Sequence, residues 1–194
     1  MRTLVLFAQP VETSFNAALH ATAVAALRKR GHDVDDCDLN AEAFDPVMHR
    51  KERIDYHDTS RNRAHVEGYV ERLLAAEALV LVFPVWNMGF PAILKGFLDK
   101  VFLPGVSFTL TPDGAYTPHL HNIKRLSAVA TYGGDRLTTF LLGDPPRHVV
   151  KRMLRSLIAP RSPCEYLAHY DMNHTKPDRR AAFLKTVEAK FLKW

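Results

Sequence analysis

Short apolar runs alternate along the chain with stretches in which apolar residues recur every three or four positions. A short, mainly apolar run is typical of a strand that is covered on both faces, and such runs lie at 2–8, 79–83 and 125–132, while residues 165–170 predict a further strand. A spacing of three to four positions is typical of a helix with one buried face, and it occurs at 15–30, 65–76, 91–102, 149–157 and 177–192. Residues 32–38 alternate polar and apolar, which predicts an exposed edge strand.

The remaining segments predict connections between these elements. Residues 39–63 are polar and show no clear period, so we expect a long connection there. Pro-Asp-Gly at 112–114 separates two β-prone runs and predicts a hairpin within 105–118. The alternation of strands and helices predicts one α/β domain over 1–194, with a parallel sheet covered on both faces. Ligands of such sheets bind outside the carboxyl ends of the strands.

One stretch carries the strongest pattern. The buried run 79–83 is followed by a seven-residue loop at 84–90 and by a helix that starts near Pro91. The loop holds Trp86 and Phe90, two large apolar side chains that need a cover. A flat, partly apolar ligand at the carboxyl end of the strand would cover them.

Two further loops lie at the same predicted edge of the sheet. The loop 9–16 ends at a helix N-terminus, where free N–H groups and the helix dipole favour a phosphate; Ser14 either caps this helix or also takes part in such a site. The loop 131–135 contains Gly133 and Gly134, which let a ligand approach the backbone closely. A phosphate site, an apolar slot and a glycine wall together fit the head of a flavin mononucleotide.

Other nucleotide and hydrolase motifs are absent from the sequence. It contains no GxGxxG after the first strand, no Walker A sequence and no GxSxG. These absences argue against the usual dinucleotide fold, a nucleoside triphosphatase and a serine hydrolase. A flavin carries the hydride chemistry itself, so the protein needs only to bind, orient and tune it.

Composition and charge limit the kinds of molecule that the protein is expected to bind. The formal net charge of +5 suits anionic small ligands, but Lys and Arg are scattered, so we expect no nucleic-acid binding. The two cysteines lie far apart and the start of the chain reads as a strand, so we expect a cytoplasmic protein without disulfides. No apolar run approaches the roughly 18 residues of a membrane span, and we expect no membrane insertion.

The ten histidines show no metal-binding spacing, so we expect no metal site. His119, His121 and His148 follow the hairpin or a Pro-Pro turn and have the setting of solvated surface residues. For proton donation we consider only Tyr132 and His148.

Three segments together resemble the flavodoxin-like NAD(P)H:quinone oxidoreductases, the group of DT-diaphorase and its shorter bacterial relatives. These segments are 83–102, 13–19 and Thr131-x-Gly-Gly134, and the first is the longest and most specific. The residues 104–108 and the segment 38–47 also match the pattern of this family. The resemblance covers roughly residues 2–135.

The resemblance implies a flavodoxin-like, doubly wound fold with a five-stranded parallel sheet in the order 2-1-3-4-5. It further implies a homodimer in which each flavin site is formed partly by the partner chain. NAD(P)H gives a hydride to the flavin and leaves, and a quinone or similar acceptor then takes its place. The flavin-binding residues that it implies are Gln9, Thr13, Ser14, Phe15, Asn16, Ala18, Pro84, Val85, Trp86, Asn87, Met88, Thr131, Tyr132, Gly133 and Gly134.

The chain departs from the family pattern at two places. Gln9 stands where the family usually has a histidine that contacts the phosphates. The stretch 135–146 lacks the Tyr and His that form a proton relay in the best-known members, so Tyr132, His148 or water replaces them, or the acceptor needs no relay. The chain is also shorter than the mammalian members, which leaves both FAD and FMN open.

Two other functions remain as alternatives at this point. One is an electron-transfer flavodoxin, although flavodoxins of that kind are usually acidic and this chain is basic. The other is a regulatory protein, such as an ancillary subunit of a transporter, that holds a flavin as a structural ligand. The sequence gives neither the acceptor nor the choice between NADH and NADPH.

Overall fold

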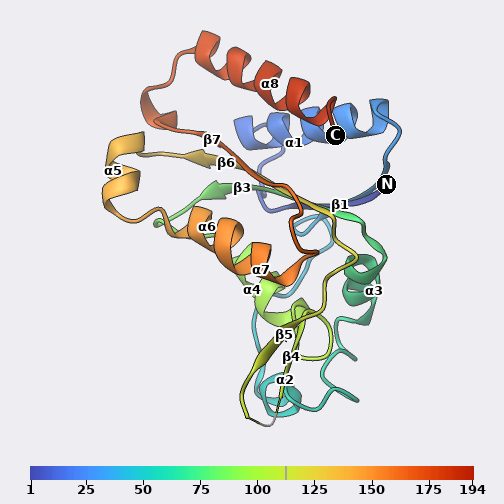
Figure 1. Ribbon diagram of the computed structural model, residues 1–194. Helices are drawn as coiled ribbons and strands as arrows, with labels where there is room; N and C mark the ends of the chain where they lie inside the picture. Colours follow the sequence, from blue (N-terminus) through green and yellow to red (C-terminus); the bar gives the residue numbers. More distant parts are fainter. Residues whose placement is uncertain (112) are drawn as a thin grey trace.

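A computed structural model describes residues 1–111 and 113–194 of the chain. Its central feature is a five-stranded parallel sheet in the order β2-β1-β3-β6-β7 (Figure 1). The strands are β1 (Arg2–Phe7), β2 (Asp33–Asp38), β3 (Ala78–Val85), β6 (Arg125–Tyr132) and β7 (Cys164–His169). The predicted strand order is therefore confirmed, and Asp33–Asp38 is an edge strand as expected.

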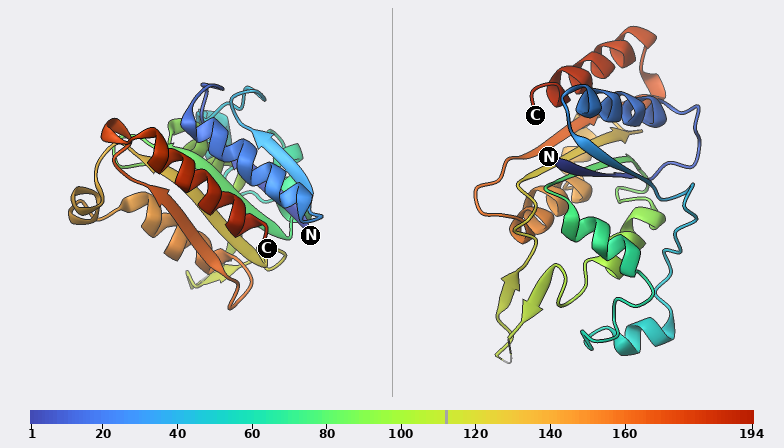
Figure 2. Two further views of the ribbon diagram at one scale, coloured as in Figure 1. Left: turned by 90° about the horizontal axis from the view of Figure 1, so that it is seen from above. Right: turned by 90° about the vertical axis from the view of Figure 1, so that its right-hand side faces the viewer.

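Helices cover both faces of the sheet, since the crossover between parallel strands must pass over a face. One face carries α1 (Phe15–Lys29) and α8 (Pro177–Phe191), which lie side by side across it (Figure 2). The other face carries α3 (Glu67–Ala75), α4 (Ala92–Val101) and the run of α6 (Pro145–His148), η1 (Val149–Leu154) and α7 (Arg155–Leu157). The predicted helix at 149–157 is present, but its first six residues form a π-helix.

Each central strand contributes to two hydrophobic cores because successive side chains point to opposite faces. Leu4 and Leu6 of β1 belong to the core under α3 and α4. Val5 and Phe7 of the same strand belong to the core under α1 and α8. This arrangement explains why the interior strands are apolar at nearly every position.

A smaller lobe extends from the α4 side of the sheet (Figure 1). It contains α2 (Arg50–Asp55) and the antiparallel hairpin of β4 (Phe108–Leu110) and β5 (Tyr116–Pro118). The predicted hairpin is thus present, while Pro112 of its expected turn lies outside the described residues. The remaining elements are α5 (Arg136–Leu141) and the 3-10 helix η2 (Met172–His174).

The helices that were not expected from the sequence include α2 and α5. The helix α2 interrupts the predicted connection 39–63, and the Glu52 carboxylate accepts the His49 backbone N–H at its start (2.9 Å). The helix α5 follows the third loop and is capped by Asp135, whose Oδ1 accepts the backbone N–H groups of Leu137 and Thr138. Both helices have six residues, which is too short to display a helical period.

The connection 39–63 is fixed to α4 rather than free. Lys100 of α4 is only 3% exposed, and its ammonium donates to the Val47 carbonyl at 2.9 Å. The same ammonium lies 3.3 Å from a Glu52 carboxylate oxygen, so the buried charge is paired. Gly96 of α4 packs directly against Pro46, whose carbonyl oxygen and Cβ occupy the space of a Cβ at position 96.

We expect Gly96→Ala to destabilise the protein by about 1–3 kcal/mol, because the added methyl group overlaps Pro46. The free energy of unfolding in urea measures the effect. Gly68→Ala in α3 is the matched control, since a Cβ there meets nothing within 4 Å. The control should raise stability by roughly 0.5–1 kcal/mol through helix propensity. Equal effects of the two changes would contradict the packing argument.

Candidate functional site

The three loops expected to form the site meet at the carboxyl edge of β1, β3 and β6. A hydrogen bond joins two of them directly, from Asn16 Nδ2 at the start of α1 to Thr131 Oγ1 at the end of β6 (3.3 Å). Both side chains are buried. Asn16 Oδ1 is also buried and has no hydrogen-bond partner among the described residues, so it can accept a bond from a ligand.

The first loop presents free donors at the N-terminus of α1. Ser14 is the N-cap, and its hydroxyl accepts the Ala17 N–H at 3.0 Å, as predicted for a cap. The amides of Phe15 and Asn16 begin the helix and therefore lack an intrahelical acceptor. Gln9 accepts the Val11 N–H through Oε1 (3.2 Å), which leaves its amide NH₂ group as a donor. This set of donors suits a phosphate.

The residues around the start of α1 also leave room for a phosphate. Thr13 and Ala18 are exposed, so the backbone around the cap is accessible to a ligand. The Phe15 ring packs edge-on against His169 of β7, at 5.4 Å between ring centroids. The helix start is thereby anchored to the far edge of the sheet.

The second loop is shorter than predicted and tightly closed. Pro84 and Val85 still belong to β3, where they pair with Thr131 and Tyr132 of β6. Trp86 and Gly89 then exchange backbone hydrogen bonds of 3.2 and 2.9 Å around Asn87 and Met88, which both have positive φ (48° and 58°). Residues other than glycine rarely hold this conformation, so the turn has a strained backbone.

The turn presents an apolar surface to solvent. The Trp86 side chain is 47% exposed, which is unusual for an indole at the end of a buried strand. Phe90 instead turns inward and packs edge-on against Phe83, with ring centroids 4.9 Å apart. The indole and the loop backbone form one wall of the site.

The third loop forms the opposite wall. Thr131 and Tyr132 end β6, and Gly133 and Gly134 lead to the Asp135 cap of α5. A Cβ at position 134 would meet no atom closer than Thr139 Oγ1 at 3.8 Å. The protein itself therefore does not require glycine at 134, whereas a ligand lying against this backbone would.

Tyr132 lies inside the protein rather than at the surface of the site. Its side chain is 1% exposed, and its hydroxyl donates to Asp144 Oδ1 and bonds to the Tyr166 hydroxyl, each at 2.6 Å. Burial, together with the neighbouring Tyr166 and Asp144, raises the pKa of Tyr132. This arrangement argues against proton donation from Tyr132 to a substrate.

The same hydrogen-bond cluster continues to an arginine. Arg147 donates through Nε to Asp144 Oδ2 (2.7 Å) and through Nη2 to the Tyr170 hydroxyl (2.6 Å). Its guanidinium carbon lies 4.4 Å from the centroid of the Tyr166 ring. We call Tyr132, Asp144, Arg147, Tyr166 and Tyr170 the tyrosine–arginine cluster; it joins β6, α6 and the end of β7.

Of this cluster, only Tyr132 was a candidate from the sequence. Asp144 and Arg147 belong to α6 and its N-cap, Tyr166 and Tyr170 belong to β7 and its end, and the four share no motif. The only local signal is the pair Asp144-Pro145, since aspartate often precedes a helix that begins with proline.

His148 lines a cavity of about 380 Å³ between α5 and α6, together with Arg136, Phe140, Asp144, Arg147 and Tyr170. This cavity, which we call the α5–α6 cavity, lies directly after the third loop in the chain. The His148 side chain forms no hydrogen bond with any residue that the structure describes. Its ring nitrogens are therefore open to a hydrogen bond with a ligand in the cavity.

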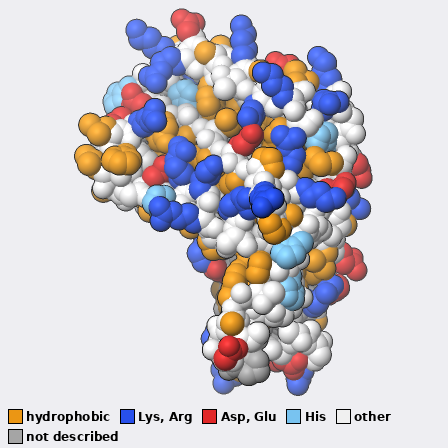
Figure 3. Space-filling view, viewed as in Figure 1, with side chains coloured by type: hydrophobic (Ala, Val, Ile, Leu, Met, Phe, Trp, Pro, Cys, Tyr) orange, Lys and Arg blue, Asp and Glu red, His pale blue; other side chains and the backbone are white. Residues whose placement is uncertain are grey.

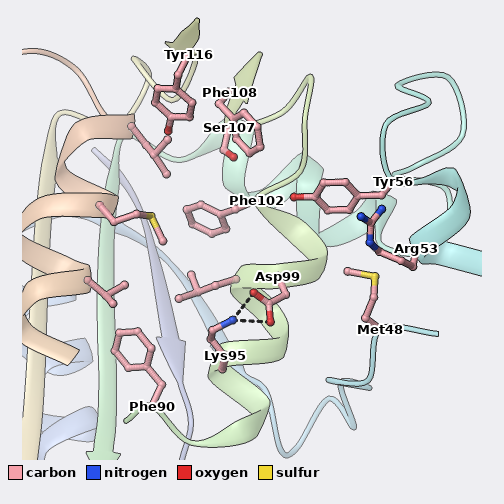
Figure 4. A pocket seen from close by; sticks show the side chains of 14 residues that line it. Met48, Arg53, Tyr56, Phe90, Lys95, Asp99, Phe102, Ser107, Phe108 and Tyr116 are labelled. Atoms are coloured by element: carbon pink, nitrogen blue, oxygen red, sulfur yellow. Dashed lines mark hydrogen bonds and ion pairs between the residues drawn. The ribbon is translucent and has the colours of Figure 1, made fainter. Parts of the chain in front are cut away.

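A larger cavity of about 540 Å³ adjoins the end of the second loop (Figure 4). Phe90 stands at one end of this α4 cavity, and Tyr116 and Phe108 of the hairpin stand at the other. Arg53 and Tyr56 form a further wall from the segment around α2. The lining is mainly apolar, apart from the Lys95–Asp99 ion pair (2.5 Å) of α4.

Two negative findings concern residues 1–111 and 113–194. No helix in them is long and apolar enough to cross a membrane. Within the same residues, no group of three or more His, Cys, Asp or Glu side chains is arranged to hold a metal ion.

The comparisons with known proteins agree with the fold. A family model described as a flavodoxin-like fold matches residues 1–188. The NAD(P)H dehydrogenase [quinone] 1 of Rattus norvegicus is 29% identical over 203 residues, which cover 95% of this chain and 74% of the rat protein. The FMN-dependent NADH:quinone oxidoreductase of Clostridium perfringens is 31% identical over 87 residues, which cover 45% of this chain and 43% of that protein.

A solved structure extends the likeness over the whole length. The crystal structure of Smu.1420 from Streptococcus mutans UA159 is 26% identical and covers 100% of both chains, with a TM-score of 0.87. The resemblance to flavodoxin-like NAD(P)H:quinone oxidoreductases is thereby confirmed. The chain belongs to the family that has this flavodoxin-like fold.

Proposed function

We propose that the protein is a flavin-dependent NAD(P)H oxidoreductase that reduces quinones or similar small acceptors. The observation that carries this proposal is the meeting of three loops at the carboxyl edge of the sheet, joined by the Asn16–Thr131 hydrogen bond. The relatives named NAD(P)H dehydrogenase [quinone] and NADH:quinone oxidoreductase support the same activity. The two half-reactions share one site, so NAD(P)H leaves before the acceptor binds.

The residues present fit a flavin. The donors of Gln9, Phe15 and Asn16 suit its phosphate, and the exposed Trp86 indole and the backbone of 133–134 suit the two sides of a flat ring. The unpartnered Asn16 Oδ1 supplies an acceptor between them. When bound, the flavin supplies the hydride chemistry, while the chain binds it, orients it and excludes water.

We propose FMN as the cofactor, and NADH or NADPH as the hydride donor. The support comes from the Clostridium relative, which is FMN-dependent by name. Of the residues named from the sequence, Pro84, Val85, Asn87, Met88 and Thr131 would contribute mainly backbone groups and packing. Thr13, Ser14 and Ala18 would surround the phosphate.

We expect Gly134→Val to lower flavin affinity by roughly tenfold or more, because a branched side chain would overlap the ring. The ligand-free variant should fold normally, since a Cβ at this position has only one ordinary contact. Asn16→Ala should also weaken retention. Absorbance spectra and chromatography of the released flavin measure the effect and identify FMN or FAD. Unchanged affinity of the Gly134→Val variant would exclude this placement of the third loop.

For the proton that accompanies reduction of the acceptor, we propose His148 as the donor. Its imidazole lines the α5–α6 cavity, whereas the Tyr132 hydroxyl is buried and engaged by Asp144. Tyr132 then acts by holding Asp144 in place. The two residues, which the sequence left as equal candidates, thus receive separate roles.

We expect His148→Gln to lower kcat for quinone reduction by about a hundredfold and to leave flavin reduction by NAD(P)H unchanged. Tyr132→Phe should instead lower the free energy of unfolding by about 1–3 kcal/mol, because Asp144 loses a buried hydrogen bond. Stopped-flow kinetics of the two half-reactions and urea unfolding separate the effects. If Tyr132→Phe lost quinone reduction and His148→Gln kept it, Tyr132 and not His148 would be the proton donor.

We propose that the protein is a homodimer and that the partner covers the α4 cavity. This cavity is apolar, it adjoins the second loop through Phe90, and the hairpin beside it exposes Leu110 and Tyr116. A second copy would remove this apolar surface from water and would complete the flavin site.

We expect Met153→Glu, which places a charge in the α4 cavity, to shift the protein from dimer to monomer. Size-exclusion chromatography with light scattering measures the mass. Leu74→Glu in α3 is the control, because Leu74 is also partly exposed but lies outside this cavity. A monomeric parent protein, or equal effects of both changes, would contradict the proposed interface.

We also propose a cytoplasmic protein that folds as one domain over 1–194. Both cysteines, Cys37 and Cys164, are free thiols, which suits a reducing compartment. The single-domain proposal rests on the C-terminal helix α8, which packs against α1 in one core.

A further inference from the structure

The α5–α6 cavity contains cationic groups that the proposed flavin chemistry does not use. Arg136 comes from the first turn of α5, and Arg147 comes from α6. Both residues line the same space of about 380 Å³ immediately after the third loop. Figure 3 shows several Lys and Arg side chains beside the apolar side chains of α5 on this part of the surface.

Arg147 is held in a fixed orientation. Asp144 and Tyr170 accept two of its N–H groups, and the Tyr166 ring lies 4.4 Å from its guanidinium carbon. The side chain is still 34% exposed, so its remaining N–H groups can reach a ligand. A planar, pre-ordered guanidinium of this kind loses little entropy when it binds a phosphate.

Arg136 is uncommitted. It forms no ion pair and donates no side-chain hydrogen bond to any residue of 1–111 or 113–194. The nearby carboxylates are already engaged: Asp135 caps α5, Asp144 binds Tyr132 and Arg147, and Asp171 pairs with His174 (2.7 Å). One positive charge therefore remains uncompensated in the cavity.

The cavity also offers an aromatic surface beside these charges. Phe140 of α5 lines it and is 74% exposed, so one face of its ring is free. Flat heterocyclic bases stack on exposed aromatic rings, whereas inorganic anions gain nothing from them. Two guanidinium groups and a free aromatic ring together match a nucleotide better than a simple anion.

We infer that Arg136 and Arg147 bind a phosphate of the nicotinamide dinucleotide, with Phe140 stacking against one of its bases. The inference rests on the proposed function, because it assigns the cavity to the hydride donor of that reaction. The phosphate has two sources within the dinucleotide. The 2′-phosphate occurs in NADPH alone, whereas the diphosphate is common to NADPH and NADH.

His148 does not conflict with this assignment. The dinucleotide leaves before the acceptor binds, so one cavity can hold a phosphate in the first half-reaction and supply a proton in the second. Arg136 thus contributes to the choice of the hydride donor. His148 contributes the proton for the acceptor.

The test measures binding of NADP⁺ and NAD⁺ to the flavin-loaded protein by isothermal titration calorimetry. We expect Arg136→Gln to raise the Kd about tenfold, as the loss of a charge-assisted hydrogen bond should. Arg136→Lys should restore part of the affinity. Arg28→Gln on the last turn of α1 is the matched control, because Arg28 is exposed, forms no ion pair among the described residues and lies at the opposite edge of the sheet.

The outcomes separate the two phosphates and can overturn the inference. A rise in Kd for NADP⁺ alone identifies the 2′-phosphate, and an equal rise for both nucleotides identifies the diphosphate. Unchanged affinities, equal effects in Arg28→Gln, or loss of flavin from Arg136→Gln would each overturn it. Steady-state oxidation of NADPH and NADH, measured in parallel, tests the proposed function separately: binding that depends on Arg136 without any oxidation would refute the activity and keep the nucleotide site.

Discussion

The parallel pairing of the strands is the constraint on which the rest of the structure depends. Parallel neighbours cannot be joined by a short turn, so each connection crosses a face of the sheet. All carboxyl ends consequently meet at one edge, where the loops after β1, β3 and β6 come together. The Asn16–Thr131 hydrogen bond is possible only because α1 begins at the same edge at which β6 ends. The candidate site is thus a consequence of topology before it is a consequence of any particular side chain.

Burial on both faces makes the sheet rigid, and this rigidity supports strain at its edge. The positive φ values of Asn87 and Met88 persist because β3 pairs with β1 as far as Val82 and with β6 as far as Val85. Behind the third loop, the hydrogen bonds of the tyrosine–arginine cluster hold the end of β6 in place. Its buried carboxylate, Asp144, is acceptable in the interior since both of its oxygens accept hydrogen bonds, one of them from a cation. Apolar packing fixes one wall of the site and a satisfied polar network fixes the other.

The smaller lobe depends on contacts that run through α4. Lys100 and Gly96 hold the connection 39–63, one through a buried ammonium and the other through the absence of a side chain. Asn62 adds hydrogen bonds of 3.0 Å to the carbonyls of Tyr56 and Pro104, which join this connection to the segment before the hairpin. The helix that follows the aromatic loop therefore shapes the α4 cavity: Phe90 stands just before its start, and Lys95, Leu98 and Asp99 line the cavity along its length.

The sequence by itself determined the elements that depend on local pattern. Continuous apolar runs specified the interior strands, helical spacing specified the long helices, and glycine, proline and capping residues marked the loops at 9–16, 84–90 and 131–135. The tertiary structure alone decided which side chains meet. Tyr132 could not be recognised as buried beside Asp144 and Tyr166, because its partners lie 12 and 34 positions away on other elements. Likewise, Arg136 and Arg147 share a cavity only because the chain turns between α5 and α6. Periodicity indicates whether a residue is buried or exposed. The partners of its side chain depend on how distant segments cross in the fold, and no local sequence pattern encodes this crossing.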